Sequence, residues 1–440
     1  MRKRIFSAVL LVAVCLLSGC AMRTVDQMYF PPKRSESYNN LQSVIDQAMV
    51  GKEYCAPISG ENQQTVQMAD LEGDGIAEYL LFAKSNSGDK PLQILIFRQQ
   101  EEDYVLADTI DSNGTAFELV EYVPMDDAGG VEIVVGRQLS DQLMRSVSVY
   151  TFKAGLIEQV LNTNYTKLLT CDLDADPLKE LMVLHPGQSD TDNGVAELYE
   201  IENETVVRSN EVSLSGPVDR LKRIITGTLH DGVPAVFVGS TVGNSAIITD
   251  IYAMVDGVFT NVSLSSESGT SVQTLRNYYV YAEDIDSDGE VELPNLINMA
   301  LPDSGSADNQ QHLIRWFSMG VDGTEINKMY TYHNYLGGWY LELGPQWASR
   351  IYVTQEGNAY EFYLLENDAF SAQKIFTIYA LTGQNREELA LQGNKFVLYR
   401  DESTTYAAHL EVASGVLSIT REGLIKSFHP IRQDWKTGEM

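Results

Sequence analysis

The sequence predicts a mainly β fold: a five-bladed β-propeller followed by a small C-terminal α+β domain. Three observations lead to this prediction. An acidic segment recurs five times at intervals of about 48 to 57 residues, four short β-like runs accompany each copy, and the pattern stops near residue 334. Repeated units of four short strands are typical of propeller blades. Six or seven blades are the alternative counts, and an open stack is less favoured because it leaves two sheet edges unpaired.

The composition is that of a globular, strongly acidic chain. Of its 440 residues, 44% are apolar and 21% are charged, which excludes wholesale disorder. Asp and Glu number 61, against 31 Lys and Arg. A surface with this charge repels phosphate groups and attracts cations. Nucleic acid is therefore excluded as a partner, and metal ions are favoured.

The first twenty residues have the organisation of an export signal. Basic residues at 2–4 precede an apolar run over 5–17, whose 13 residues are too few to span a bilayer. Leu17-Ser18-Gly19-Cys20 follows and resembles the lipobox of bacterial lipoproteins. The resemblance implies that residues 1–19 are a signal peptide and that Cys20 carries lipid, which anchors the protein to the extracytoplasmic side of the cell membrane. An ordinary cleaved signal peptide is the alternative.

Residues 20–54 are expected to hold the lipidated cysteine, a flexible tether and one short helix. The segment has two prolines and two serines up to residue 37, and apolar residues at helical spacing predict a helix over 38–49. Beyond it, Cys55 and Cys171 could pair in an oxidising compartment. Cys171 ends an apolar run, which favours a buried free thiol.

The five repeats occupy residues 55–334. Three copies of the acidic loop match closely, namely Asp70–Glu78, Asp172–Glu180 and Asp284–Glu292, and weaker copies begin at Pro124 and Gly227. First strands are expected before the loops, at 65–69, 117–123, 166–171, 220–226 and 278–283. Second strands are expected at 79–83, 131–135, 181–184, 233–238 and 291–297, third strands at 92–97, 147–152, 196–201, 247–254 and 313–317, and fourth strands at 104–110, 156–162, 205–214, 258–264 and 326–332.

Each close copy places carboxylates at positions 1, 3, 5 and 9 of a tight loop. The candidate metal ligands are Asp70, Glu72, Asp74, Glu78, Asp172, Asp174, Asp176, Glu180, Asp284, Asp286, Asp288 and Glu292. Calcium takes about six to eight oxygen ligands, and one loop with this spacing supplies several of them. Solvated acidic turns without metal are the alternative interpretation.

A buried strand, rather than a helix, is expected after each of these loops. In this context the pattern resembles the calcium loops of FG-GAP and VCBS repeats, as in integrin-type β-propellers. The resemblance implies a structural Ca²⁺ that stabilises a strand connection. Gly75 and Gly289 stand at position 6, where glycine permits a sharp turn, but Pro177 replaces it in the third loop. The sequence therefore ranks the first and fifth loops above the third, and expects no metal in the second and fourth.

Residues 335–440 are expected to form the small α+β domain. The segment has β-like runs at 350–354, 359–365, 374–381, 394–400 and 405–412, and helical spacing over 417–431. It opens with aromatic residues, of which Tyr335, Trp339, Tyr340 and Trp347 are candidates for stacking on a ligand such as a sugar ring. Burial at a domain junction is the favoured alternative, because aromatic side chains are usually mostly buried.

No motif of a nucleophile elbow, a phosphate loop, a dinucleotide fingerprint or a zinc helix occurs in the sequence. The histidines lack metal-ligand spacing, and His185 and His230 follow strands of different repeats. We therefore expect a binding or scaffold protein whose partners are the membrane and an unknown protein or glycan. The alternative is a propeller-based enzyme that acts on a polysaccharide or a peptide, with an active site assembled from distant loops.

Overall fold

The computed structural model is built mainly of antiparallel β-sheets. It describes residues 36–86, 88–139, 144–185, 192–202, 205–216, 220–243, 246–278, 280–299, 312–347, 350–365, 372–411 and 419–432. These residues form six sheets of four or five strands, together with short helices. The mainly β fold predicted from the sequence is confirmed.

Helix α3 (Glu36–Ala48) precedes the first two sheets and confirms the helix expected over 38–49. The first sheet contains β1 (Lys52–Tyr54), β2 (Val66–Ala69), β3 (Glu78–Ser85), β4 (Leu92–Gln100) and β5 (Asp103–Ser112). Its order is β1-β3-β4-β5, and β2 also pairs with β3. The second sheet has the order β6-β7-β8-β9, with β6 (Ala116–Val123), β7 (Glu132–Gln138), β8 (Arg145–Lys153) and β9 (Leu156–Tyr165).

The third and fourth sheets repeat this meander. The third contains β10 (Lys167–Cys171), β11 (Glu180–His185), β12 (Val195–Glu202) and β13 (Thr205–Arg208), and β14 (Val212–Ser213) also pairs with β12. The fourth contains β15 (Leu221–Thr228), β16 (Pro234–Val242), β17 (Ala246–Val255) and β18 (Val258–Asn261), followed by the 3-10 helix η2 (Val272–Thr274). In both sheets the acidic or acidic-like loop joins the first strand to the second.

The last two sheets include the C-terminal part of the chain. The fifth has the order β19-β20-β21-β22-β28, with β19 (Leu293–Asn298), β20 (His312–Met319), β21 (Glu325–Asn334), β22 (Trp339–Leu343) and β28 (Phe428–Pro430). The sixth has the order β23-β24-β25-β27-β26, with β23 (Ile351–Glu356), β24 (Ala359–Leu365), β25 (Ala372–Thr382), β26 (Phe396–Arg400) and β27 (Thr404–Leu410). The helices here are η4 (Pro345–Trp347), α4 (Arg386–Leu389) and α5 (Arg421–Ser427).

One expected strand differs from the prediction. In the described part of 278–283, β pairing is reduced to a single bridge between Glu283 and Glu292. The fifth sheet is extended on its other side, where β22 pairs with β21 and β28 pairs with β22. The fifth repeat therefore takes its outer strands from the C-terminal segment.

Neighbouring sheets pack face to face, and each pair shares an apolar cluster. Between the first and second sheets, Phe82 and Phe117 meet edge to face with ring centroids 5.2 Å apart. Further clusters join the second sheet to the third, the third to the fourth, the fourth to the fifth, and the fifth to the sixth. Stability is therefore built neighbour by neighbour, as in other repeat proteins.

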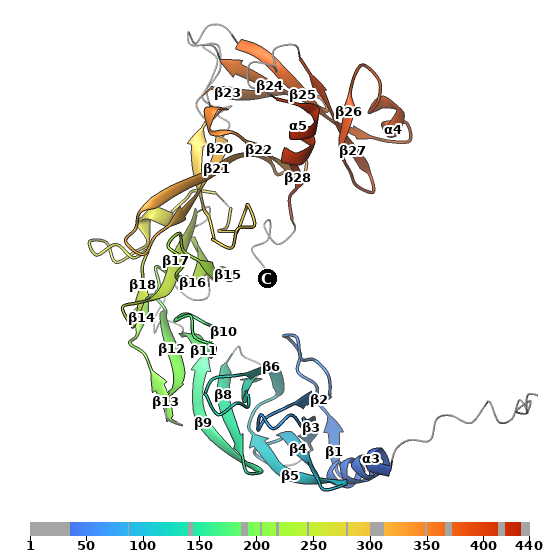
Figure 1. Ribbon diagram of the computed structural model, residues 1–440, viewed down its shortest axis with the longest axis vertical. Coiled ribbons are helices and arrows are strands. Elements are labelled where there is room, and N and C mark those ends of the chain that lie inside the picture. The colour runs from blue at the N-terminus through green and yellow to red at the C-terminus, as the bar shows by residue number, and fades with distance from the viewer. Residues whose placement is uncertain are drawn as a thin grey trace, which may run out of the picture.

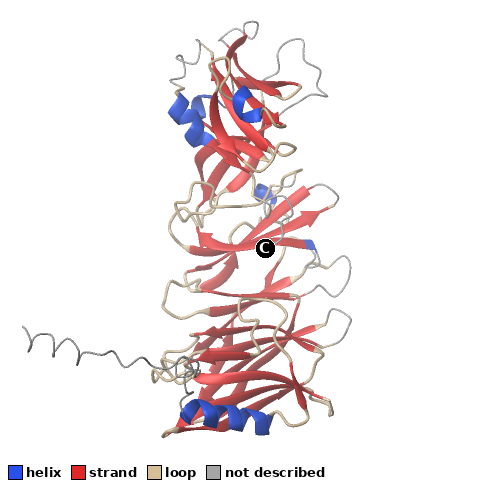
Figure 2. Ribbon diagram, turned by 90° about the vertical axis from the view of Figure 1, so that its right-hand side faces the viewer, coloured by secondary structure: helices blue, strands red, loops and turns tan. Residues whose placement is uncertain are grey.

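The sheets follow one another along an open arc (Figures 1 and 2). Alternate residues of β3 point to opposite faces, so Phe82 packs on the second sheet while Leu81 packs under α3. Leu41 and Ile45 of α3 cover this outer face. In a closed ring, the same face would pack on the last blade. Instead, the first and sixth sheets lie at opposite ends of the arc, and the described residues show no closed ring.

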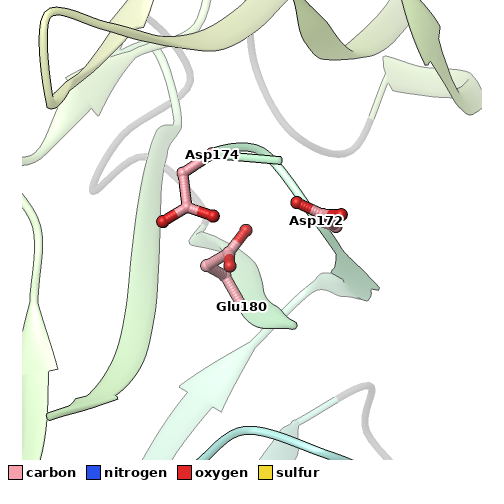
Figure 3. A group of neighbouring side chains, drawn as sticks. All are labelled: Asp172, Asp174 and Glu180. Atoms are coloured by element: carbon pink, nitrogen blue, oxygen red, sulfur yellow. The ribbon is translucent and has the colours of Figure 1, made fainter. Parts of the chain in front are cut away.

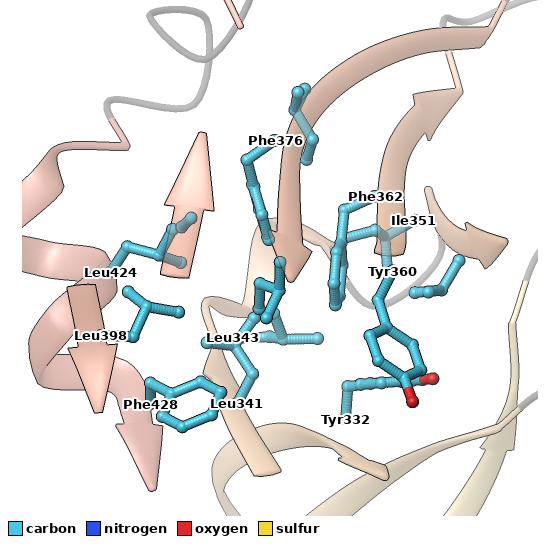
Figure 4. Packing of buried hydrophobic residues seen from close by; sticks show 14 of the residues in the cluster. Tyr332, Leu341, Leu343, Ile351, Tyr360, Phe362, Phe376, Leu398, Leu424 and Phe428 are labelled. Atoms are coloured by element: carbon cyan, nitrogen blue, oxygen red, sulfur yellow. The ribbon is translucent and has the colours of Figure 1, made fainter. Parts of the chain in front are cut away.

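The expected boundary near residue 334 falls inside a hairpin of the fifth sheet. Strand β21 ends at Asn334, and its last residues pair with β22, where Trp339 lies opposite Asn334. The apolar cluster of the fifth and sixth sheets contains Tyr332 together with Leu341, Phe362 and Phe428 (Figure 4). Residues on both sides of the expected boundary therefore share one core.

Successive acidic loops also contact one another. Gly73 has a φ of 69°, and a Cβ atom on it would lie 2.0 Å from the carbonyl oxygen of Gly129 in the second loop. The fourth and fifth loops meet where the N–H of Thr228 donates to the carbonyl of Gly289. The loops therefore form part of the contact between neighbouring repeats.

We expect Gly73→Ala to destabilise the protein more than Gly75→Ala. Both positions have positive φ, which costs an L-residue about 1 to 2 kcal/mol, but a Cβ on Gly75 has no atom within 4 Å. The overlap with Gly129 should bring the cost of Gly73→Ala to roughly 3 kcal/mol. Urea unfolding of both variants measures the difference, and equal costs would contradict the tight loop contact.

Candidate metal centre

The glutamate at position 9 has the same role in four of the loops. Its Oε2 atom accepts a hydrogen bond from the backbone N–H of the residue seven positions earlier. The four bonds are Leu71 N to Glu78 at 2.9 Å, Met125 N to Glu132 at 2.9 Å, Leu173 N to Glu180 at 2.7 Å and Ile285 N to Glu292 at 3.0 Å. All four glutamates are buried. This bond closes each loop and leaves one carboxylate oxygen for another partner.

The aspartate at position 1 is held differently in the third loop. In the first loop both oxygens of Asp70 accept backbone N–H groups, from Asp74 and Gly75, and Asp284 is held in the same way in the fifth. Pro177 has no N–H to donate at the position of Gly75. Among the described residues, only the Oδ1 atom of Asp172 accepts a bond, from the N–H of Ala175 at 2.8 Å. The proline thus leaves an oxygen of Asp172 available.

Three carboxylates converge in the third loop. One oxygen each of Asp172, Asp174 and Glu180 lie within 4.8 Å of one another, and Figure 3 shows Asp174 and Glu180 facing each other. Asp176 does not belong to this group, and its Oδ1 atom accepts the N–H of Leu178 at 2.7 Å. Three of the four predicted ligands of this loop therefore come together.

The fifth loop forms two overlapping groups that meet the same distance criterion. One contains Asp284, Asp286 and Glu292, and the other contains Asp288, Glu290 and Glu292. The first loop forms no such group among the described residues, which include Asp70, Glu72, Asp74 and Glu78. Its Glu72 turns toward the second sheet, where it accepts the N–H of Gly155 at 3.3 Å. The expected ranking of the first loop above the third is therefore not reproduced by the geometry.

Burial and neighbouring charges favour the protonated form of the central glutamates. Burial raises the pKa of Glu180 to about 7, with Asp174 and Glu200 adding to the effect. Burial raises the pKa of Glu292 to about 8, with Asp286 and Asp288 adding to the effect. A cation placed among these oxygens would favour the charged form. These buried acidic clusters could bind a metal ion.

Two acidic residues near these clusters are absent from the predicted set. Glu290 stands at position 7 of the fifth loop. Glu200 lies on β12 next to Tyr199, and Tyr199 pairs with Leu181, the residue that follows Glu180. Burial raises the pKa of Glu200, and Asp174 adds to this shift. Only the strand register brings Glu200 near the third loop, so no spacing within the loop could have found it.

The predicted aromatic site is corrected by the structure. Trp339 is fully buried and stacks on Phe428 at 5.2 Å, and Tyr340 is buried between the rings of His333 and His429. Both therefore contribute to the core and cannot stack on a ligand. Tyr335 is 38% exposed, and the side chain of Trp347 lies outside the described residues. The four residues do not form a common stacking surface among the described side chains.

The remaining candidate residues are separate. Cys55 and Cys171 are free thiols, and burial raises the pKa of each. His185 Nε2 lies 2.8 Å from Glu197 Oε2, and His230 Nδ1 lies 3.3 Å from Glu290 Oε2, so each has its own carboxylate. Cys20 and the predicted signal peptide lie outside the described residues. No helix of the described part has the length and apolar character needed to cross a membrane.

A cavity of about 560 Å³ opens beside the first strands of the third and fourth sheets. Leu168 and Leu169 of β10 and Ile224 of β15 line it, together with an ion pair of Arg145 and Glu118, whose Nη2 and Oε1 atoms are 3.4 Å apart. Its size and mixed apolar and charged lining suit a small ligand or a short extended segment.

Comparison with known proteins identifies no family. No protein-family model and no curated protein matches the chain. Among solved structures, a protein from Lactobacillus plantarum is similar at 10% identity and a TM-score of 0.26, over 72% of this chain and 85% of the other. The exotype rhamnogalacturonan lyase YesX is similar at 11% identity and a TM-score of 0.29, over 76% of this chain and 67% of the other. Likeness at this level carries no argument about this chain.

Proposed function

We propose that this protein is a lipid-anchored extracytoplasmic binding or scaffold protein, in which a divalent cation stabilises the third acidic loop. The observation that carries the metal proposal is the convergence of Asp172, Asp174 and Glu180. The N-terminal basic residues, the short apolar run and the lipobox-like segment ending at Cys20 support the anchor. The protein's ligand is a protein or a glycan that the anchored body holds outside the cell.

Calcium is the ion that best fits the third loop. The converging ligands are all carboxylate oxygens, which hard divalent cations prefer, and the loop is open to water that would complete the coordination. In the described part of the chain, no lysine or arginine forms an ion pair with these three carboxylates. Since Asp172 follows β10 and Glu180 begins β11, the ion would link two adjacent strands. Its role is therefore structural.

Two features support a binding role. The cavity beside β10 and β15 offers apolar walls and a charged pair to a ligand. Strand β10 is also an edge strand of its sheet, and edge strands have backbone groups that can pair with an extended peptide. These features favour a scaffold in which edge strands such as β10 and β15 are available to contact a ligand.

We expect calcium to stabilise the wild-type protein and Asp174→Asn to remove this effect. An extracellular calcium module with a Kd of about 0.1 to 1 mM gains about 1 to 2 kcal/mol at 5 mM calcium. Urea unfolding in calcium and in EDTA measures this gain. The matched control is Glu72→Gln, at the same loop position in the first repeat, which should leave the gain unchanged. Equal stability of the wild-type protein in calcium and in EDTA would refute the metal proposal.

A further inference from the structure

A β-bulge in the fifth sheet inserts a lysine beside the fifth loop. In the ladder between β20 and β21, Phe317 pairs with Asn327 and Trp316 pairs with Met329, so Lys328 is the extra residue. Bulges redirect a side chain away from the regular alternation of a strand. Here the bulge directs the Lys328 ammonium group to the acidic loop.

The same bulge occurs at the same place in two other repeats. In the first sheet the extra residue between the pairs Phe97–Leu106 and Ile96–Asp108 is Ala107. In the second sheet the extra residue between Tyr150–Gln159 and Val149–Leu161 is Val160. Both residues are apolar and pack against the clusters of their sheets. Among these three bulges, only the one in the fifth repeat places a charged residue at this position.

The ammonium group contacts carboxylates of the fifth loop. The Nζ atom of Lys328 lies 2.6 Å from Asp288 Oδ2, 2.8 Å from Glu290 Oε2 and 4.0 Å from Glu292 Oε1. Glu292 is fully buried, and its Oε1 atom accepts no hydrogen bond in the described part of the chain. A cation nearby favours the charged form of such a buried carboxyl group.

The third loop has the opposite arrangement. The ladder between β12 and β13 runs from Tyr199–Arg208 to Glu202–Thr205 without a register shift, so no extra residue enters there. Its nearby strand residue is Glu200, which adds negative charge to the cluster of Asp174 and Glu180. Lys179 stands at position 8 of the third loop but forms no ion pair with its converging carboxylates in the described part of the chain, whereas carboxylates of the fifth loop are paired with Lys328.

We propose that the Lys328 ammonium group is the permanent cation of the fifth loop, which makes this loop independent of metal and leaves the third loop as the exchangeable metal site. The inference concerns the same loops as the proposed function and rests on it for the third loop only. A divalent ion among Asp288, Glu290 and Glu292 would have to displace an ammonium group already bonded to two of these carboxylates. In the other group, both oxygens of Asp284 already accept backbone N–H groups, and an ion there would be repelled by the ammonium group, which lies 4.0 Å from Glu292 Oε1. Wild-type protein therefore binds one calcium ion per chain at these loops.

The test is calcium titration and thermal melting of the full chain with Lys328→Met. This variant should bind one more calcium ion than wild type, with a Kd of about 0.1 to 1 mM. It should melt below wild type in EDTA, and calcium should raise its Tm by roughly twice the wild-type shift, because two sites contribute. The matched control is Lys374→Met, which removes a lysine paired with Glu361 at 3.0 Å outside any acidic loop. That variant should show the wild-type calcium shift.

A second variant tests the proposal in a protein that keeps Lys328. Asp286→Asn removes a carboxylate of the fifth loop and should leave the wild-type calcium shift unchanged. A smaller shift in this variant would show that the fifth loop already binds calcium and would overturn the proposal. An unchanged ion count in a folded Lys328→Met protein would overturn it as well.

The two proposals fail in different ways. If wild type binds no calcium but Lys328→Met binds one ion, the third-loop site is refuted and the role of Lys328 stands. If wild type binds one ion and Lys328→Met also binds only one, the third-loop site stands and the role of Lys328 is refuted. Repeating the titration with Lys328→Met in the Asp174→Asn background assigns the gained ion to the fifth loop.

Discussion

A fragment of residues 38–334 is expected to lose the structure of the fifth sheet. The truncation removes β22, which pairs with Tyr330 to Asn334 of β21, and it removes the fully buried Trp339. Loss of one large buried aromatic side chain alone costs about 3 to 5 kcal/mol. The truncation also exposes Leu313 and Tyr332, which belong to the shared cluster of the fifth and sixth sheets. Hydrogen exchange of the β20 and β21 amides measures the loss.

A fragment of residues 38–347 is the matched control for this truncation. It also lacks the sixth sheet and β28, but it retains β22 and therefore the β21–β22 hairpin. Protection of the β20 and β21 amides should be higher in the longer fragment. If the shorter fragment protects these amides as well as the full chain does, the repeats end at residue 334 as the sequence predicts.

Replacing Cys20 by serine is expected to move the protein from the membrane fraction to the soluble fraction. Two acyl chains anchor a protein stably, because each buried methylene group contributes about 0.8 kcal/mol. A serine hydroxyl in place of the thiol removes the expected acceptor for these chains. None of the described helices could hold the protein in a membrane by spanning it. Cell fractionation and blotting of the full chain measure the distribution.

The matched control is Cys55→Ser, which changes a free thiol in the body of the protein. This variant should stay in the membrane fraction. Equal membrane association of wild type and Cys20→Ser would refute the lipid anchor and leave the ordinary signal peptide as the interpretation of residues 1–19.

The sequence by itself determined the local elements and their recurrence. Alternating and continuous apolar runs marked the strands of the first four repeats, since burial of a sheet face depends on side-chain spacing along one strand. The helix over 38–49 was predicted in the same way, from apolar residues at helical spacing. The recurrence of Asp70–Glu78 at later positions located the loops that connect first and second strands.

The tertiary structure alone decided how the sheets are arranged. Helix α3 was expected from the sequence, whereas β28 lies within 417–431, which was expected to be helical and forms a helix only over Arg421–Ser427. The packing partners of both elements are distant in the chain. Helix α3 covers the outer face of the first sheet, and β28 joins the fifth sheet almost 90 residues after β22. A strand pattern shows that a face is buried and does not show which element buries it. The closed ring and the domain boundary at residue 334 both depended on such packing partners, which the sequence pattern does not show.

The tertiary structure also decided which loops gather their carboxylates. The sequence counted ligands and treated Pro177 as a defect, whereas the folded loop shows that the missing N–H leaves an oxygen of Asp172 available. The sequence could not place Lys328, because a single extra residue in a ladder changes where a side chain points. Loop composition is a local property, but the charge at a loop depends on strand register, since register determines which distant side chain reaches it.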